Sequence, residues 1–212
     1  MIYGSNLLRS MVQAGEIKNT YEGAINPASI NLRLGDSFKR IVEYQPMLKL
    51  GMEVEYEDVP LADNEYVILW PGEFMLATTM EWISVPIGLA AFVQGRSSIG
   101  RIGLTVQNAG FVDPGFHGHI TLELVNEGPR PIILYVGYPV VQLVYMEASD
   151  VGEPYNGKYN GQVDATGSKM QEDIYKPGNQ VEIDDVIVAT PVDPEVPEIE
   201  ADLDDLYKDE EA

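Results

Sequence analysis

The chain places two arginines and two serines inside a seven-residue stretch bounded at one end by glycine. The stretch reads Gly95-Arg96-Ser97-Ser98-Ile99-Gly100-Arg101. Arginine offers a bidentate fork to phosphate, serine hydroxyls donate hydrogen bonds, and glycine lets the backbone approach an oxyanion. A helical turn that starts near Ser97 would add free N–H groups. The stretch therefore fits a phosphate-binding loop, although it fits a plain polar turn as well, and it lacks the ending of a Walker A loop.

A second stretch combines a carboxylate with glycines, aromatic rings and two histidines: Gly110-Phe111-Val112-Asp113-Pro114-Gly115-Phe116-His117-Gly118-His119. Asp113-Pro114-Gly115 predicts a tight turn. The glycines suggest a hairpin arm whose backbone approaches a flat ligand, with Phe116 available for stacking. The two histidines would share one face of a strand, but the chain has no cysteine and no evident third ligand, so we expect no zinc site.

The next segment, residues 119–126, alternates apolar and polar residues as a half-buried strand does. Leu122 and Leu124 are expected on the core face, together with Ile120. Glu123 then emerges on the opposite face. There it is either a solvent-exposed glutamate or a general base held by a rigid strand.

A mainly β framework is expected to position these residues. Apolar residues at helical spacing predict one short helix near the start, capped by Ser5 and ended by Gly15. The first predicted strand begins at Ile30 and closes at Gly35. Further strands are predicted at residues 66–70, 74–79, 90–93, 104–107, 119–126, 132–136 and 140–146. Short strands at this spacing are typical of a sandwich or barrel.

The charge of the chain is strongly negative and unevenly distributed. The 212 residues include 13 Lys+Arg and 34 Asp+Glu, a formal net charge of −21. Residues 182–212 alone hold 13 acidic residues and one basic residue. We therefore predict a domain over residues 1–176 and an acidic, proline-containing tail over residues 177–212. The tail is expected to be a solvated, mobile segment, with a docking segment or a nucleic-acid mimic as the alternatives.

Composition also limits the partners that we expect. Nucleic-acid polymers and anionic membranes both attract positive surfaces, so neither is expected to bind this chain. No run of about 18 apolar residues suggests a membrane span. The absence of cysteine, together with a start that does not resemble a secretory signal, fits a cytoplasmic location.

The stretches described above resemble the dCTP deaminases, which are relatives of the trimeric dUTPases. The resemblance rests on residues 95–101, 109–116 and 120–123, and it extends to residues 27–35, 71–79, 137–143 and 155–162. A glutamate ten residues after Asp113 is typical of the deaminases, because dUTPases usually carry an apolar residue there. The resemblance implies a distorted β-barrel or jelly roll of the dUTPase-like type with a short N-terminal helix. It also implies a homotrimer with active sites between subunits.

The resemblance implies hydrolytic deamination of dCTP to dUTP and ammonia. In bifunctional members, hydrolysis of dUTP to dUMP and pyrophosphate follows in the same site. Glu123 would be the general base that activates a water at C4 of cytosine, while Ser97 and Arg101 would position the water and Glu123. Asp113 would assist the second step. Two alternatives are a dUTPase without deaminase activity and a non-catalytic nucleotide-binding or interaction protein of this fold.

The resemblance further implies a set of substrate-binding residues and a metal. The triphosphate would be held by the arginine-serine stretch and by a C-terminal lid, the deoxyribose by Asp113 and Phe116, and the base by the loop before Phe111. Mg²⁺ would be bound through the phosphates, without zinc and without protein ligands to a metal. The substrate-binding residues so implied are Arg96, Ser97, Ser98, Asn108, Ala109, Gly110, Asp113, Phe116, Tyr155, Lys158 and Gln162.

Overall fold

A computed structural model describes residues 1–45, 47–62, 65–107 and 110–173 of the chain. Its N-terminal helix α1 (Ser5–Ala14) confirms the predicted helix and ends at Gly15, which has a positive φ of 77°. The predicted cap was wrong, because Gly4 holds the capping position and Ser5 is already the first helical residue. No helix within the described ranges is long and apolar enough to cross a membrane. The tail predicted for residues 177–212 lies outside those ranges, so it stays a prediction.

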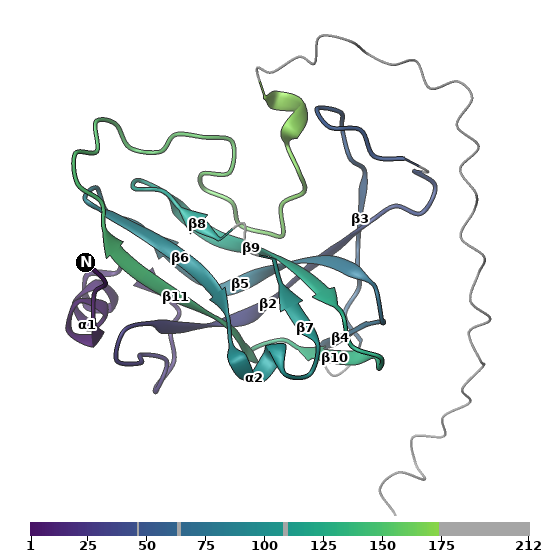
Figure 1. The fold of residues 1–212 in the computed structure, drawn as a ribbon, viewed down its shortest axis with the longest axis horizontal. Helices are drawn as coiled ribbons and strands as arrows, with labels where there is room; N and C mark the ends of the chain where they lie inside the picture. The colour runs from purple at the N-terminus through teal and green to yellow at the C-terminus, as the bar shows by residue number, and fades with distance from the viewer. Residues whose placement is uncertain (46, 63–64, 108–109, 174–212) are drawn as a thin grey trace, which may run out of the picture. The chain divides into compact units, whose positions relative to one another are not determined.

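Nine of the eleven strands form one antiparallel sheet, which curls into an open, distorted barrel (Figure 1). The strands are β1 (Ile17–Lys18), β2 (Ile30–Ile41), β3 (Tyr56–Asp58), β4 (Tyr66–Leu69), β5 (Phe74–Ser84), β6 (Leu89–Gly95), β7 (Leu104–Val106), β8 (Phe111–Val112), β9 (His117–Asn126), β10 (Ile132–Tyr135) and β11 (Pro139–Glu147). The sheet order is β7-β9-β5-β2-β11-β6-β8, with β1 beside β5 and β3 beside β2. Strands β4 and β10 form a separate ladder. The mainly β, barrel-like fold with an N-terminal helix is confirmed.

Strand β2 continues past Gly35, where the sequence predicted that it would stop. Its pairing with β5 changes register between Leu34 and Phe38, so the glycine lies at an irregularity inside the strand. A Cβ atom on Gly35 would lie only 2.6 Å from Cγ2 of Thr78. The glycine thus permits a close approach of two strands and does not mark a strand end.

The segment around Asp113 forms the predicted turn but not the predicted hairpin arm. The N–H of Phe116 donates to the Asp113 carbonyl at 3.1 Å, and Gly115 has a φ of 95°, an arrangement that favours proline followed by glycine. The predicted hairpin arm was wrong, because the two strands that flank the turn do not pair with each other. Strand β8, just before the turn, pairs with β6, whereas β9, just after it, pairs with β5 and β7. The turn therefore carries the chain from one part of the barrel to another.

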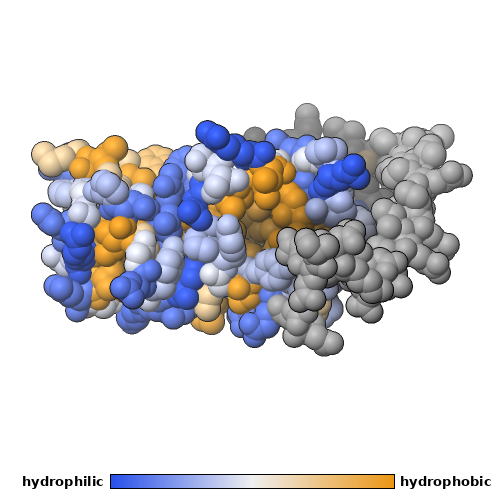
Figure 2. All heavy atoms as spheres, turned by 90° about the horizontal axis from the view of Figure 1, so that it is seen from below, coloured by the Kyte–Doolittle hydropathy of each residue, from blue (hydrophilic) through white to orange (hydrophobic). Residues whose placement is uncertain are grey.

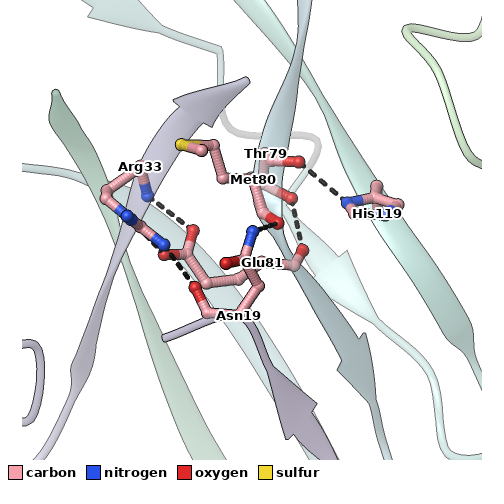
Figure 3. Close-up of polar contacts among 6 residues, drawn as sticks. All are labelled: Asn19, Arg33, Thr79, Met80, Glu81 and His119. Carbon is pink, nitrogen blue, oxygen red and sulfur yellow. Dashed lines mark hydrogen bonds and ion pairs between the residues drawn. The ribbon is translucent and has the colours of Figure 1, made fainter. Parts of the chain in front are cut away.

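A buried ion pair joins β2 to β5 (Figure 3). The Glu81 carboxylate is fully buried and accepts from the backbone N–H and from Nε of Arg33, both at 2.7 Å. The same guanidinium donates to the Asn19 carbonyl, and the Asn19 amide donates to the Met80 carbonyl at 2.9 Å. Burial raises the pKa of Glu81, and the hydrogen bonds from Arg33 oppose this rise. Replacing Arg33 by a neutral residue would leave the buried Glu81 carboxylate without a compensating charge.

Strand β9 is held in register beside β5, even though the β5–β9 ladder is interrupted between Thr78 and Trp82. The Thr79 hydroxyl fills the interruption: it accepts from the N–H of Ile120 at 3.0 Å and donates to the Glu81 carbonyl at 2.9 Å. His119 Nδ1 lies 2.9 Å from the Thr79 carbonyl oxygen (Figure 3). The predicted alternation along β9 is confirmed, since every second residue from Gly118 to Asn126 is buried.

Asn126, at the end of β9, yields a test of what holds this part of the fold together. Its fully buried side-chain amide donates to the carbonyls of Leu69 and Arg130 at 2.9 and 2.8 Å and accepts from the Gly128 N–H at 2.9 Å. We expect Asn126→Ala to lower the free energy of unfolding by about 2–3 kcal/mol, because three backbone groups lose their partner. Thermal unfolding should then show a Tm lower by roughly 5–10 °C.

The matched control is Asn6→Ala on the exposed face of α1, where the amide oxygen accepts only from Arg9 at 3.3 Å. We expect this change to leave Tm within about 1 °C, as is usual for surface positions. Equal Tm values for the two variants would contradict the role given to Asn126.

Candidate active site

A cavity of about 490 Å³ lies among β8, β9 and the C-terminal segment over residues 155–168. Its volume falls in the range of pockets that hold small molecules and cofactors. Six of the residues predicted from the sequence line it together: Gly110, Asp113, Phe116, Glu123, Tyr155 and Gln162. Tyr155 and Gln162 lie more than 30 residues along the chain from Glu123, so only the fold brings the set together.

The Glu123 carboxyl enters this cavity from the polar face of β9, half-buried. Its position is fixed from both sides, because β5 pairs with it through Leu76 and its carbonyl accepts from the Gln107 N–H at 2.9 Å. Burial raises the pKa of Glu123. Neither lysine nor arginine is found among the described residues that line the cavity. Among the described residues, Glu123 is thus a partly desolvated carboxylate with no lysine or arginine in the same cavity, as suits a proton acceptor.

The Asp113 turn and Phe116 form one wall of the cavity. The rings of Phe116 and Tyr155 lie 6.3 Å apart, centroid to centroid, and the N–H of Tyr155 donates to the Pro114 carbonyl at 2.7 Å. A Cβ atom on Gly115 would lie 2.6 Å from Cβ of Pro154. The turn and the C-terminal segment are therefore packed tightly, and they hold an apolar ring beside the Asp113 carboxylate.

Gly110 lies where its backbone can face a ligand in the cavity. Its carbonyl accepts from the Val93 N–H at 2.8 Å, and an added Cβ would lie 2.4 Å from the Val93 carbonyl oxygen. Only glycine fits there. The two preceding residues predicted for this site, Asn108 and Ala109, lie outside the described residues.

The arginine-serine stretch forms the predicted turn of helix, α2 (Ser97–Gly100), but it does not reach this cavity. Arg96 donates from Nη1 to the Pro139 carbonyl at 2.7 Å. Ser97, Ser98 and Arg101 are exposed. Figure 1 shows α2 at the lower end of the barrel, whereas β8 and the C-terminal segment lie at its upper end. A single chain therefore separates the predicted phosphate-binding residues from the predicted general base.

The two predicted lid residues are both bound to their own chain. Lys158 Nζ donates to the Lys169 carbonyl at 3.0 Å and to the Asp173 carboxylate at 2.5 Å, a contact that raises the pKa of Lys158. Lys158 does not line the cavity. The Gln162 side chain does line it, and its Nε2 donates to the His119 carbonyl at 2.7 Å. Direct contact of either side chain with phosphate stays a prediction.

Several lining residues were missed by the sequence interpretation. Thr121 could have been found, because it shares the polar face of β9 with Glu123 and lies two residues away. Tyr56, on β3, gave no signal. Gln107, Tyr159, Thr166 and Ser168 lie in the loop before Phe111 and in the C-terminal lid that the resemblance implied, but the sequence did not single them out as site residues. These missed residues are Tyr56, Gln107, Thr121, Tyr159, Thr166 and Ser168.

The described part of the chain holds no group of three or more histidine or acidic side chains placed to bind a metal ion. Asp113 and Glu123 are the only carboxylates among the described lining residues. His117 is exposed, and His119 is engaged by the Thr79 carbonyl. These donors do not form a protein cage for a metal.

Comparison with known proteins identifies the family of this chain. The sequence model of the dCTP deaminase-like family matches residues 2–148. The protein of Persephonella marina named "dCTP deaminase, dUMP-forming" is 40% identical over 176 residues, which cover 80% of this chain and 97% of that protein. The protein of the same name from Methanobrevibacter smithii is 43% identical over 164 residues, covering 72% and 84% of the two chains.

Among solved structures, the 2'-deoxycytidine 5'-triphosphate deaminase from Agrobacterium tumefaciens has a similar fold, with a TM-score of 0.55. The two sequences are 22% identical, and the match covers 69% of this chain and 48% of the Agrobacterium tumefaciens chain. Sequence similarity gives the stronger argument for the family. The region matched by the family model includes Arg96, Asp113 and Glu123. This chain belongs to the dCTP deaminase-like family.

Proposed function

We propose that this chain hydrolyses dCTP to dUTP and ammonia, and then dUTP to dUMP and pyrophosphate in the same cavity. The observation that carries the proposal is the half-buried, cation-free carboxylate of Glu123 in a cavity that also holds Asp113 and Phe116. The relatives named above form dUMP, as their names state, which supports the second step. The ten-residue spacing from Asp113 to Glu123 supports the first.

In the first step, Glu123 takes a proton from a water while the water oxygen attacks C4 of cytosine. The same carboxyl then returns a proton to the exocyclic amino group, which leaves as ammonia, so that dCTP and water give dUTP and ammonia. A base whose pKa is raised by burial holds the proton long enough to deliver it. Phe116 and the turn before it would orient the deoxyribose, with the Asp113 carboxylate accepting from the 3'-hydroxyl.

In the second step, a water attacks the α-phosphate of dUTP and pyrophosphate leaves, with Asp113 helping to deprotonate that water. We propose that Mg²⁺ arrives with the nucleotide, held by phosphate oxygens, because Asp113 and Glu123 alone make no cage for it. The metal would then neutralise charge on the triphosphate when it is bound. A cytoplasmic location stays a prediction from the sequence.

We further propose that the active site is completed by a second copy of the chain within a homotrimer. A triphosphate is a polyanion, and the described cavity offers it carboxylates but no lysine or arginine. The exposed hydroxyls and guanidinium of α2, which Ser97 and Arg101 contribute, would supply the missing donors from a neighbouring subunit.

Exposed apolar side chains support this assembly. Figure 2 shows hydrophobic side chains gathered around a hollow in the face seen from below, with hydrophilic residues around them. The described residues include several large hydrophobic side chains that are about half exposed at the ends of α2, β4 and β10. They are Trp70, Ile102, Ile133 and Tyr135. Such surface is commonly covered on assembly.

Product analysis tests the activity. We expect the protein with dCTP and Mg²⁺ to release ammonia and to accumulate dUMP and pyrophosphate, as separated by chromatography. Glu123→Gln should slow ammonia release at least ~100-fold, because the proton acceptor is lost, while the variant still binds nucleotide. If the native protein hydrolyses dUTP but leaves dCTP unchanged, deamination is refuted. If Glu123→Gln deaminates dCTP at the native rate, Glu123 is not the base.

Mixed trimers test the composite site. Arg101→Ala and Glu123→Gln should each be inactive alone, because each removes one half of every site. When the two are co-expressed and purified through two different tags, only mixed trimers remain, and in each of them roughly a third of the sites have both native residues. We therefore expect activity to return in the mixture. A mixture as inactive as its components would show that Arg101 and Glu123 act within one chain.

The pH dependence of kcat tests the state of Glu123. The carboxylate must be ionised to accept a proton, so kcat should fall as the pH is lowered through the Glu123 pKa. Because burial raises that pKa, the fall should be centred above the ordinary glutamate value of about 4.3. Arg101 from a neighbouring copy would oppose the shift, so in Arg101→Gln, where activity is lost, the Glu123 carboxyl followed by NMR should titrate at still higher pH than in the native protein. An unchanged midpoint in Arg101→Gln would contradict contact between the two side chains.

A further inference from the structure

The C-terminal segment that covers the cavity is held by a row of hydroxyl groups. Four backbone N–H groups between residues 165 and 169 each donate to a side-chain hydroxyl, at distances from 3.0 to 3.2 Å. We name the four acceptors the hydroxyl row. The pairs are Ala165 N–H to Ser37 Oγ, Thr166 N–H to Thr121 Oγ1, Ser168 N–H to Tyr56 Oη and Lys169 N–H to Tyr159 Oη.

The hydroxyl row spans elements that are distant in sequence. Ser37 lies on β2, Tyr56 on β3 and Thr121 on β9, while Tyr159 belongs to the C-terminal segment itself. Tyr56, Thr121 and Tyr159 also line the cavity. The segment therefore crosses the cavity and is attached along its walls.

Gly167, the residue skipped by the row, fits closely against Tyr56. A Cβ atom at Gly167 would lie 2.6 Å from two ring carbons of Tyr56. The Tyr56 ring thus supports the backbone of the segment while its hydroxyl accepts from the next residue, Ser168. Both contacts fix the height of the segment over the cavity.

The Thr121 hydroxyl makes two hydrogen bonds, one to the backbone of residues 165–169 and one to the side chain of Gln162. It accepts from the Thr166 N–H at 3.1 Å and donates to Oε1 of Gln162 at 3.4 Å. Gln162 in turn pairs with His119, the N–H of His119 donating to the Gln162 carbonyl at 2.9 Å. Thr121 lies two residues from Glu123 on the same face of β9. The strand that carries the proposed base therefore also anchors the cover.

We propose that Thr121 and Tyr56 are positioning residues for the reaction, because their hydroxyls hold residues 165–169 as a lid over the bound nucleotide. The inference rests on the proposed function for its catalytic part only. Each contact is one neutral hydrogen bond, of modest net value, so the lid is held in place but can be released for substrate entry and product exit. Once the nucleotide has entered, it is held under the closed lid.

Such a lid predicts which kinetic constant changes. A site that is competent only when closed shows an apparent affinity reduced by the fraction of closed molecules. Losing hydroxyls therefore raises KM, whereas kcat, measured with the lid closed over substrate, changes little. Glu123 keeps its place, because its own backbone contacts with β5 and Gln107 are untouched.

Hydrogen exchange of the full chain without nucleotide tests the lid directly. In Tyr56→Phe/Thr121→Val, the amides of Thr166 and Ser168 lose their acceptors, and we expect residues 165–169 to exchange roughly 10-fold faster or more. The KM for dCTP should rise by roughly 3- to 30-fold with kcat within about 2-fold. Thr121→Ser should restore slow exchange of Thr166 and the native KM, since the hydroxyl is retained.

The matched control is Tyr44→Phe, which removes a tyrosine hydroxyl that contacts Glu55 and no lid residue. It should change neither exchange nor KM, and all variants should keep a Tm close to that of the native protein. Unchanged exchange at residues 165–169 in the double variant would overturn the proposal, as would a loss in kcat at constant KM. If the native protein leaves dCTP unreacted, the proposed function fails, while the exchange result still decides whether the hydroxyl row holds the lid.

Discussion

Strand β9 can be placed in only one register, and the core and the site both depend on that register. Leu122 and Leu124 are 1% and 0% exposed in the core, while Thr121 and Glu123 face the cavity. A slip of one residue would exchange the two sets, exposing leucines and burying a carboxylate. The Thr79 hydroxyl guards against this slip where the ladder to β5 is interrupted, since it takes up the otherwise free N–H of Ile120. Burial of apolar side chains, worth about 2 kcal/mol for each leucine, thus also fixes the position of the carboxylate that we propose as the base.

The same fold separates charges that the proposed reaction needs together. The cavity holds carboxylates, whereas the exposed guanidinium and hydroxyls of α2 lie elsewhere on the chain. With a net charge of −21, the long-range field of the chain repels a nucleotide. Screening at physiological salt limits that repulsion to about 8 Å, so a few cations placed in the site decide whether the triphosphate binds. Assembly would then do more than cover apolar surface, because it would complete the electrostatics of the site.

Local patterns predicted the parts of this architecture that depend on local physics. The alternation along β9, the Asp113 turn and the short helix at Ser97 follow from side-chain periodicity and turn chemistry, and all three are found. The hairpin arm and the end of β2 at Gly35 were wrong, because strand pairing and close backbone approach depend on distant residues such as Thr78. The hydroxyl row escaped prediction for the same reason, since Ala165 and its acceptor Ser37 are 128 residues apart.

Deamination and phosphate hydrolysis both consume one water, yet both suffer if bulk water competes for the reacting groups. A lid answers this requirement when it encloses the nucleotide and still opens between turnovers. Hydroxyl acceptors suit such a lid better than ion pairs, since breaking a neutral hydrogen bond at a wet edge exposes no charge. Backbone donors suit it as well, because they are present whatever the side chains of residues 165–169. The attachment of the lid to Thr121 then makes β9 the common support of the cover and of Glu123, while the backbone contacts of Glu123 with β5 and Gln107 hold the base in place whether the lid is open or closed.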